Sequence, residues 1–225
     1  MISYEGTEYA YFTQPIVDIS KNKTVVHELL LRIFDKKEGR WKLPASFQVP
    51  VGLQIDLANE VLENLNSKNI SINLTQKQFE DEVVCDKITD FYQKSAVNNL
   101  TIEMVKVSSY AIFKRMQEKY HKEGIILGID DVGSDNKLQD VMPLLDDVDT
   151  IKFASQNIRH LSQIKVLKQL NYWFEQAEKR HLLFTFEGVE GLKDIRMAKK
   201  LGITRCQGYF FSKPILPADL PDSLR

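Results

Sequence analysis

The pattern of apolar and polar residues divides the chain into two kinds of segment. Short runs rich in β-branched and aromatic residues (β-rich runs) alternate with longer stretches in which apolar residues recur at helical spacing. β-Branched and aromatic residues fill 9–19 and 24–34, and only four residues separate these two runs. Parallel neighbours need a crossover of about a dozen residues, whereas antiparallel strands can be joined by a tight turn. The pattern therefore predicts that the first two strands form an antiparallel hairpin.

After a charged stretch with prolines at 35–50, which predicts a loop, helices and strands alternate. Helical spacing is found at 55–65, 76–94, 108–122, 162–179 and 192–200, and β-rich runs are found at 70–74, 100–105, 125–130, 150–153, 182–187 and 203–211. An irregular segment precedes 150, and an extended tail is expected from Pro214. Eight strands interleaved with helices predict an α/β fold, a (β/α)8 TIM-like barrel with an antiparallel first strand. The alternative is an open doubly wound sheet, but its glycine-rich phosphate-binding fingerprint is absent.

Composition narrows the class of protein. A chain of 225 residues with 43% hydrophobic content fits one domain, 1–225, with a substantial core. Lys and Arg total 30 and Asp and Glu 31, so no global field favours a nucleic acid polymer or an acidic membrane. Two cysteines make no disulfide framework. Without a leader-like N-terminus or an apolar run of membrane-spanning length, we expect a cytoplasmic location.

Polar residues recur near the carboxyl ends of the predicted strands. In a barrel these ends converge on one face, so one cleft would be lined by Glu28, Asn73, Glu103, Asp130, Asp131, Lys152 and Glu187. Asp130 and Asp131 follow the apolar run 125–129 directly. Because neighbouring side chains on a strand point to opposite faces, both must lie at the strand's end.

Five carboxylates in one cleft repel one another, and this raises their pKa values. Hard divalent cations held by oxygen ligands remove that cost, and Asn73 can add a neutral carbonyl oxygen. Two cations sharing Asp130 or Asp131 would form a hydrolytic site for a phosphodiester. The four histidines lack zinc-like spacing, so Mg²⁺ or Mn²⁺ is the expected metal. A barrel with an incidental acidic mouth is the structural alternative.

Short motifs along almost the whole chain resemble, in order, those of the EAL-domain family of cyclic di-GMP phosphodiesterases. The matching segments are YFTQPIVD at 11–18, HELLLR at 27–32, INLT at 72–75, IEMVK at 102–106, DDVG at 130–133, IK at 151–152, FEGVE at 186–190 and QGYFFSKP at 207–214.

The resemblance implies hydrolysis of one phosphodiester bond of cyclic di-GMP to linear pGpG with two Mg²⁺ or Mn²⁺ ions. By position it assigns the metals to Glu28, Asn73, Glu103, Asp130, Asp131 and Glu187. Gln14 and Arg32 fall at substrate-binding positions, and Arg32 would hold a phosphate. Lys152 would orient the attacking water or stabilise developing charge, and Gln207 would lie beside the water that the metals bind. Glu190 resembles the glutamate that braces the loop after the two aspartates.

The chain departs from the family pattern at several positions. The loop DVGSDN at 131–136 replaces DFGTGY, Ala154 replaces an aspartate, and Lys106 replaces a glutamate. An alternative function follows, a catalytically inactive EAL module that acts as a cyclic di-GMP receptor or as a protein-binding adaptor in signalling. The resemblance also leaves room for a homodimer and for a regulatory protein partner.

Overall fold

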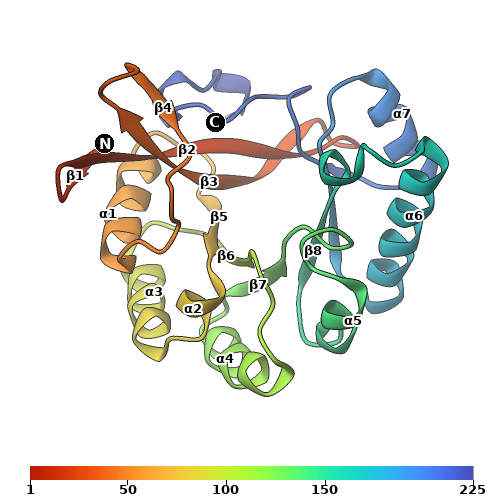
Figure 1. The fold of residues 1–225 in the computed structure, drawn as a ribbon, viewed down its shortest axis with the longest axis horizontal. Coiled ribbons are helices and arrows are strands. Elements are labelled where there is room, and N and C mark those ends of the chain that lie inside the picture. Colours follow the sequence, from red (N-terminus) through yellow and green to blue (C-terminus); the bar gives the residue numbers. More distant parts are fainter. Residues whose placement is uncertain (225) are drawn as a thin grey trace.

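The first two long strands, β2 (Thr7–Asp18) and β3 (Lys23–Asp35), pair antiparallel over nearly their whole length, as the sequence predicts. In the computed structural model, which describes residues 1–224, this hairpin belongs to a ten-stranded sheet (Figure 1). Six parallel strands then follow around the barrel, and they are β5 (Asn69–Leu74), β6 (Asn99–Met104), β7 (Ile126–Ile129), β8 (Thr150–Ala154), β9 (Leu183–Glu187) and β10 (Arg205–Cys206). Because β10 pairs with β2 and β2 with β3, eight strands close into the predicted TIM-like barrel.

Helices cover the outer face of the barrel on the left, lower and right sides of Figure 1, and the β2–β3 hairpin runs along the upper side. They are α1 (Val51–Leu62), α2 (Gln76–Phe79), α3 (Glu82–Lys94), α4 (Tyr110–Lys122), α6 (Gln163–Arg180) and α7 (Leu192–Leu201). Their apolar faces are buried in the core, as for Phe113 and Tyr120 of α4, which both stack on Phe79 of α2. No helix within residues 1–224 combines the length and apolar character that crossing a bilayer requires.

Several boundaries differ from the predicted ones for local reasons. The helical stretch 76–94 is split, because the side chain of Asp81 accepts a hydrogen bond from the backbone N–H of Val83 and starts α3 afresh. Between β7 and β8 the irregular segment holds only α5 (Leu138–Val141) and a 3-10 turn, η1 (Met142–Leu144). Two short edge strands were not predicted, and they are β1 (Ile2–Tyr4) and β4 (Arg40–Lys42), the latter inside the expected loop.

The predicted strand 203–211 is wrong in its length, since only Arg205 and Cys206 pair with their neighbours. At Gly208 the backbone has φ 156° and passes so close to Val189 that a Cβ would lie 2.2 Å from the Val189 carbonyl oxygen. The chain turns there, and Phe210 N–H donates to that same carbonyl. The tail is not fully extended either, because it contains the 3-10 turns η3 (Pro217–Asp219) and η4 (Asp222–Leu224); a further such turn, η2 (Ser155–Ile158), follows β8.

Candidate active site

Sheet register brings the predicted strand residues together at one end of the barrel. Asn73 of β5 is the direct partner of Glu103 of β6, and Gln14 of β2 is the direct partner of Glu28 of β3. All four side chains point into the barrel mouth or its edge, because residues paired across a sheet share a face. Thr75, two residues after Asn73, closes the strand by capping α2.

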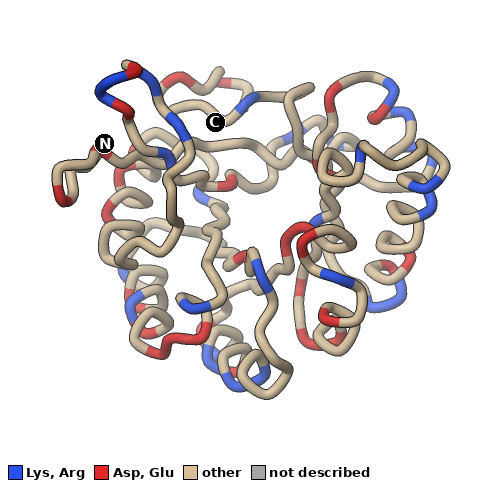
Figure 2. The backbone as a smooth tube through the Cα atoms, viewed as in Figure 1, with Lys and Arg blue, Asp and Glu red and all other residues tan. Residues whose placement is uncertain are grey.

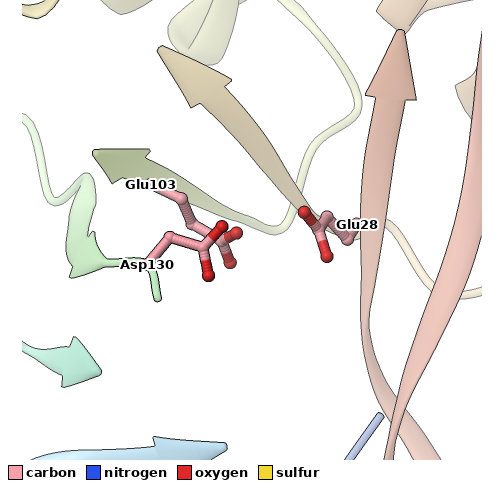
Figure 3. A group of neighbouring side chains, drawn as sticks. All are labelled: Glu28, Glu103 and Asp130. Carbon is pink, nitrogen blue, oxygen red and sulfur yellow. The ribbon is translucent and has the colours of Figure 1, made fainter. Parts of the chain in front are cut away.

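Two groups of carboxylates lie close enough to share a metal ion. Glu28, Glu103 and Asp130 form one group and Asp130, Asp131 and Glu187 form the other; within each, an oxygen from every member lies within 4.8 Å of the others. Figure 3 shows the first group, with the carboxylates pointing toward one another from separate elements. Asp130 belongs to both groups, so it is the carboxylate that two cations in this mouth could share.

Lys152 of β8 is almost completely buried among these carboxylates, with 1% of its surface exposed. Its Nζ donates to Glu28 Oε2 and Glu103 Oε2, each at 2.9 Å, and lies 3.6 Å from Asp130 Oδ1. It also forms an ion pair with Glu187. Burial opposes its charge, but the four surrounding carboxylates together raise the pKa of Lys152 well above its ordinary value, so its ammonium group stays charged.

One ammonium group cannot compensate five carboxyl groups, and their pKa values diverge as a result. Burial raises the pKa of Glu103 to about 8, with the charges of Glu28 and Asp130 adding to the effect. Burial and the neighbouring Asp130 raise the pKa of Asp131 to about 7. Burial also raises the pKa of Asp130 and that of Glu187. The mouth therefore holds protons at neutral pH when no cation is bound.

Glu28 is the exception within this cluster. Burial alone would raise the pKa of Glu28, but Lys152 and three hydrogen bonds lower it. Asn73 donates from Nδ2 to Glu28 Oε1 at 2.6 Å, and Gln207 donates from Nε2 to Glu28 Oε2 at 2.7 Å. Both amides thereby leave their buried carbonyl oxygens, Asn73 Oδ1 and Gln207 Oε1, without a hydrogen-bond partner. Unpartnered neutral oxygens beside carboxylates are the donor set that hard divalent cations prefer, so these residues fit Mg²⁺ or Mn²⁺.

The loop that carries the two aspartates is held by Asn136, a residue that sequence reasoning missed. Its buried side chain donates to Val105 O at 3.0 Å and Asp130 O at 2.6 Å, and accepts from Val107 N–H at 3.0 Å. It thus ties the backbone at Asp130 to the segment after β6. Asp131 takes a left-handed conformation with φ 52°. An asparagine in a turn is commonplace, so the sequence gives no signal for this role.

Asn157 contacts the same loop from outside, since its Nδ2 donates to Asp131 Oδ1 at 2.9 Å and to Ser134 Oγ at 3.2 Å. The bracing role expected of Glu190 is not what its contacts show. Glu190 is exposed, and its Oε1 accepts from Arg159 Nη1 at 2.6 Å, because the turn after β8 brings that guanidinium beside it. Arg159 also donates to Gly188 O at 2.7 Å.

A cleft of about 350 Å³ opens beside the carboxylates, lined by Gln14, Arg32, Gln207 and Tyr209 as well as by Asp130 and Asp131. A neighbouring hollow of about 260 Å³ shares Glu28, Arg32 and Asp130 with it. Arg32 is half-buried, with its guanidinium carbon 6.0 Å from the centroid of the Phe12 ring, and Gln14 donates to Ser212 O at 2.9 Å. The two hollows provide space on both sides of Arg32. Of the departures, Ala154 is buried and Lys106 is exposed at the rim.

The fold and the site together define a class of protein, namely α/β barrels with an antiparallel first strand and a cluster of carboxylates at the mouth. The family model of the EAL domain matches residues 3–214, and the chain belongs to this family. The oxygen sensor protein DosP of Escherichia coli (strain K12) is 27% identical to it over 213 residues. That match covers 81% of this chain but only 26% of DosP, so the chain spans about a quarter of that relative.

Solved structures of EAL proteins have the same fold. The EAL enzyme Bd1971 in its cAMP- and cyclic-di-GMP-bound form superposes with a TM-score of 0.78 at 22% identity, over 93% of this chain and 63% of that one. The PaMucR phosphodiesterase in complex with cyclic di-GMP superposes with a TM-score of 0.79 at 19% identity, over 92% of each chain. At such identities the superpositions establish the barrel.

Proposed function

We propose that the protein is a cyclic di-GMP phosphodiesterase that hydrolyses one phosphodiester bond to give linear pGpG with two Mg²⁺ or Mn²⁺ ions. The observation that carries the proposal is the pair of carboxylate groups sharing Asp130, with the free oxygen of Asn73 beside them. Glu28, Asn73, Glu103 and Asp130 would hold one cation, and Asp130, Asp131 and Glu187 the other. Such cations supply an activated water and offset charge on a phosphodiester.

The chain's own residues have separate tasks in this reaction. Lys152 keeps its proton, because its pKa is raised well above its ordinary value, so it acts as a fixed charge and not as a base. A fixed buried charge stabilises negative charge that develops on the phosphate oxygens. Gln207 is anchored to Glu28 through Nε2, which leaves its Oε1 free to accept a hydrogen bond from the attacking water. Glu28 is thereby oriented from both sides, by Asn73 and by Gln207.

Substrate recognition would fall to the cleft beside Arg32. Its guanidinium can hold a phosphate with two hydrogen bonds, a geometry that lysine does not offer. Gln14, fixed by its bond to Ser212 O, lies along the same wall. Two adjoining hollows that share Arg32 suit a ligand with two nucleobases flanking phosphates. Family membership supports the same ligand, as do the cyclic-di-GMP-bound forms of Bd1971 and of the PaMucR phosphodiesterase.

A receptor without turnover is the second candidate, and one observation favours it. Lys152 already contacts four carboxylates, and Glu103 and Asp131 retain protons near neutral pH, so the mouth is partly compensated without any cation. In that state the cleft beside Arg32 could still bind the dinucleotide.

Turnover by purified protein separates the two candidates. Cyclic di-GMP is incubated with protein and Mn²⁺, then Mg²⁺, and pGpG is followed by chromatography, with Glu28→Ala as the inactive control. Production of pGpG by the wild type alone supports the phosphodiesterase. Binding measured by calorimetry without product, in either metal, supports the receptor, and absence of both overturns the proposed function.

A further inference from the structure

A further hollow lies away from the mouth, between α6 and α7 on the outside of the barrel. It is a groove of about 910 Å³. Its floor is apolar and consists of Leu161, Val166, Leu167, Met197 and Leu201. Leu167 is 40% exposed, so part of this apolar floor faces solvent. Both helices lie side by side at the right of Figure 1.

The rim of the groove is basic. The cationic side chains that line it are Arg159, Lys168, Lys193, Arg196 and Lys200, and the acidic ones are Glu190 and Asp194. Both acids are already engaged, because Glu190 pairs with Arg159 and Asp194 accepts backbone N–H groups at the start of α7. Within residues 1–224 the ion pairs include none of the other four cations. Figure 2 shows the basic segments along α6 and α7. The groove therefore offers unpaired positive charge above an apolar floor.

The length of the groove limits what it can hold. Its lining on α6 runs from Gln163 to Asn171 and on α7 from Lys193 to Leu201. Eight residues of helix rise about 12 Å, which is about two helical turns. A helix laid between two helices buries an apolar stripe with the spacing i, i+3, i+4, i+7, and about two turns present one such stripe.

We propose that this groove docks an acidic amphipathic helix of a protein partner. Apolar side chains of the partner would cover Leu167 and Met197, and its carboxylates would meet Lys168, Lys193, Arg196 and Lys200. A concave floor favours a helix over a bilayer, which needs apolar side chains that project outward. An apolar floor without planar aromatic side chains also disfavours nucleic acid, whose bases need stacking partners.

The groove adjoins the mouth through one pair of residues. Glu190 lines both the groove and the cleft beside Arg32, and its partner Arg159 also holds Gly188 O, next to Glu187. A partner docked in the groove would thus lie against the wall of the candidate active site. The docking proposal itself does not depend on whether that site is catalytic.

Peptide binding to the full chain tests the proposal. Three labelled helical peptides of about 14 residues share one length: the first has a leucine stripe with glutamates, the second the same stripe with lysines, and the third has serines in place of the leucines. Fluorescence anisotropy is measured on wild type, on Lys193→Glu with Arg196→Glu, and on the matched control Lys87→Glu with Lys122→Glu, on α3 and α4. Circular dichroism verifies folding of each variant.

We expect the acidic leucine peptide to bind at least about tenfold tighter than the other two, and the α7 double variant to lose about tenfold in affinity while the control does not. Equal binding of the three peptides, or equal loss in both double variants, would overturn the proposal. Two further results would also overturn it. One is α7-dependent binding to phosphatidylserine vesicles without peptide binding. The other is a wild-type dimer in sedimentation that the α7 variant dissociates, which would make a second copy the occupant.

Discussion

The ligands of the candidate metal centre reach the barrel mouth in two different ways. Glu28, Asn73, Glu103 and Glu187 stand on strands, and their positions follow from the pairing of β3, β5, β6 and β9 in one sheet. Asp130 and Asp131 stand on the loop after β7, where the regular strand pairing has ended and single backbone bonds remain, from Asp130 N–H to Met104 O at 3.1 Å and from Val132 N–H to Lys152 O at 3.0 Å. The ladders of the sheet hold the first set, whereas the second set depends on these two backbone bonds and on the side chain of Asn136.

This difference between strand and loop residues indicates which positions of the site can change while the fold stays the same. A strand-borne ligand moves only if the barrel moves, so its geometry is inherited with the fold. A loop-borne ligand depends on a few contacts that another residue can replace. Here the loop DVGSDN is tied to the segment after β6 through Asn136 and touched from outside by Asn157. We therefore expect substitutions at Asn136 and Asn157 to change the affinity of this candidate site for a metal while leaving the strands in place.

The largest effect is expected from a strand-borne ligand. Glu103→Gln keeps the shape of the buried side chain but removes a carboxylate that would bind a cation, so turnover of cyclic di-GMP should fall by at least about a thousandfold. Steady-state pGpG production measures this, with Glu118→Gln on the outer face of α4 as the control. A loss in Glu103→Gln no larger than in Glu118→Gln would show that Glu103 is not part of the site.

A large effect on stability is expected at Lys152. Lys152→Met leaves buried carboxylates without their cation, and breaking such a pair costs about 3–5 kcal/mol in the metal-free protein. Thermal melting in chelator should show a Tm lower by about 10 °C, and added Mn²⁺ should restore most of the difference. Lys106→Met, at the exposed rim, should leave the Tm unchanged. A Tm of Lys152→Met equal to that of wild type in chelator would refute the compensation described above.

A smaller effect separates the loop from the strands. Asn136→Ala removes the side-chain hydrogen bonds that tie Asp130 O to the segment after β6, and we expect Mn²⁺ affinity to fall about 10- to 100-fold. Asn157→Ala, which removes an exposed contact to Asp131, should cost only a few-fold. Calorimetric titration with Mn²⁺ gives both values. Equal losses in the two variants would mean that Asn136 does not position the loop.

The smallest expected effect is a gradual change of Mn²⁺ affinity with pH. The pKa values of Glu103 and Asp131, raised to about 8 and about 7, mean that the metal-free mouth holds protons that a cation must displace. Mn²⁺ affinity should therefore rise as pH increases from 6 to 8.5, by up to about tenfold per unit for each proton displaced. Metal-free stability should change in the opposite direction. A raised folded-state pKa favours folding at low pH, and that contribution is lost as pH rises through about 7 and 8. A pH-independent affinity would contradict the assigned ligands.

The sequence predicts the part of this site that lies on strands, because the carboxyl ends of all parallel strands of a barrel meet on one face. The partners Asn73 and Glu103 could be placed together once each was assigned to the end of its strand. The closed barrel and its antiparallel hairpin were likewise predictable, from a connection too short for a parallel crossover. The residues predicted to bind metal lie together at the mouth, and Gln14, Arg32, Lys152 and Gln207 lie beside them.

Features that depend on contacts between distant segments could not be predicted. Asn136 matters because its amide reaches Val105 and Val107, and nothing in the loop's own sequence indicates that contact. The length of the strand predicted at 203–211 was overestimated because its aromatic residues favour β-structure. In the structure the close approach of Gly208 to Val189 ends the strand pairing. The contact of Glu190 with Arg159 follows from the turn after β8, which the strand pattern does not define.

Anomalous scattering from crystals soaked in Mn²⁺ tests the central claim most directly, namely that strands and loop together build two cation sites sharing Asp130. We predict two peaks on either side of the Asp130 carboxylate, one toward Glu28, Asn73 and Glu103 and one toward Asp131 and Glu187. Crystals of Asn136→Ala should keep the first peak more strongly than the second, whose ligands lie mainly on the loop. A mouth without peaks, with Lys152 still in contact with the carboxylates, would contradict the account.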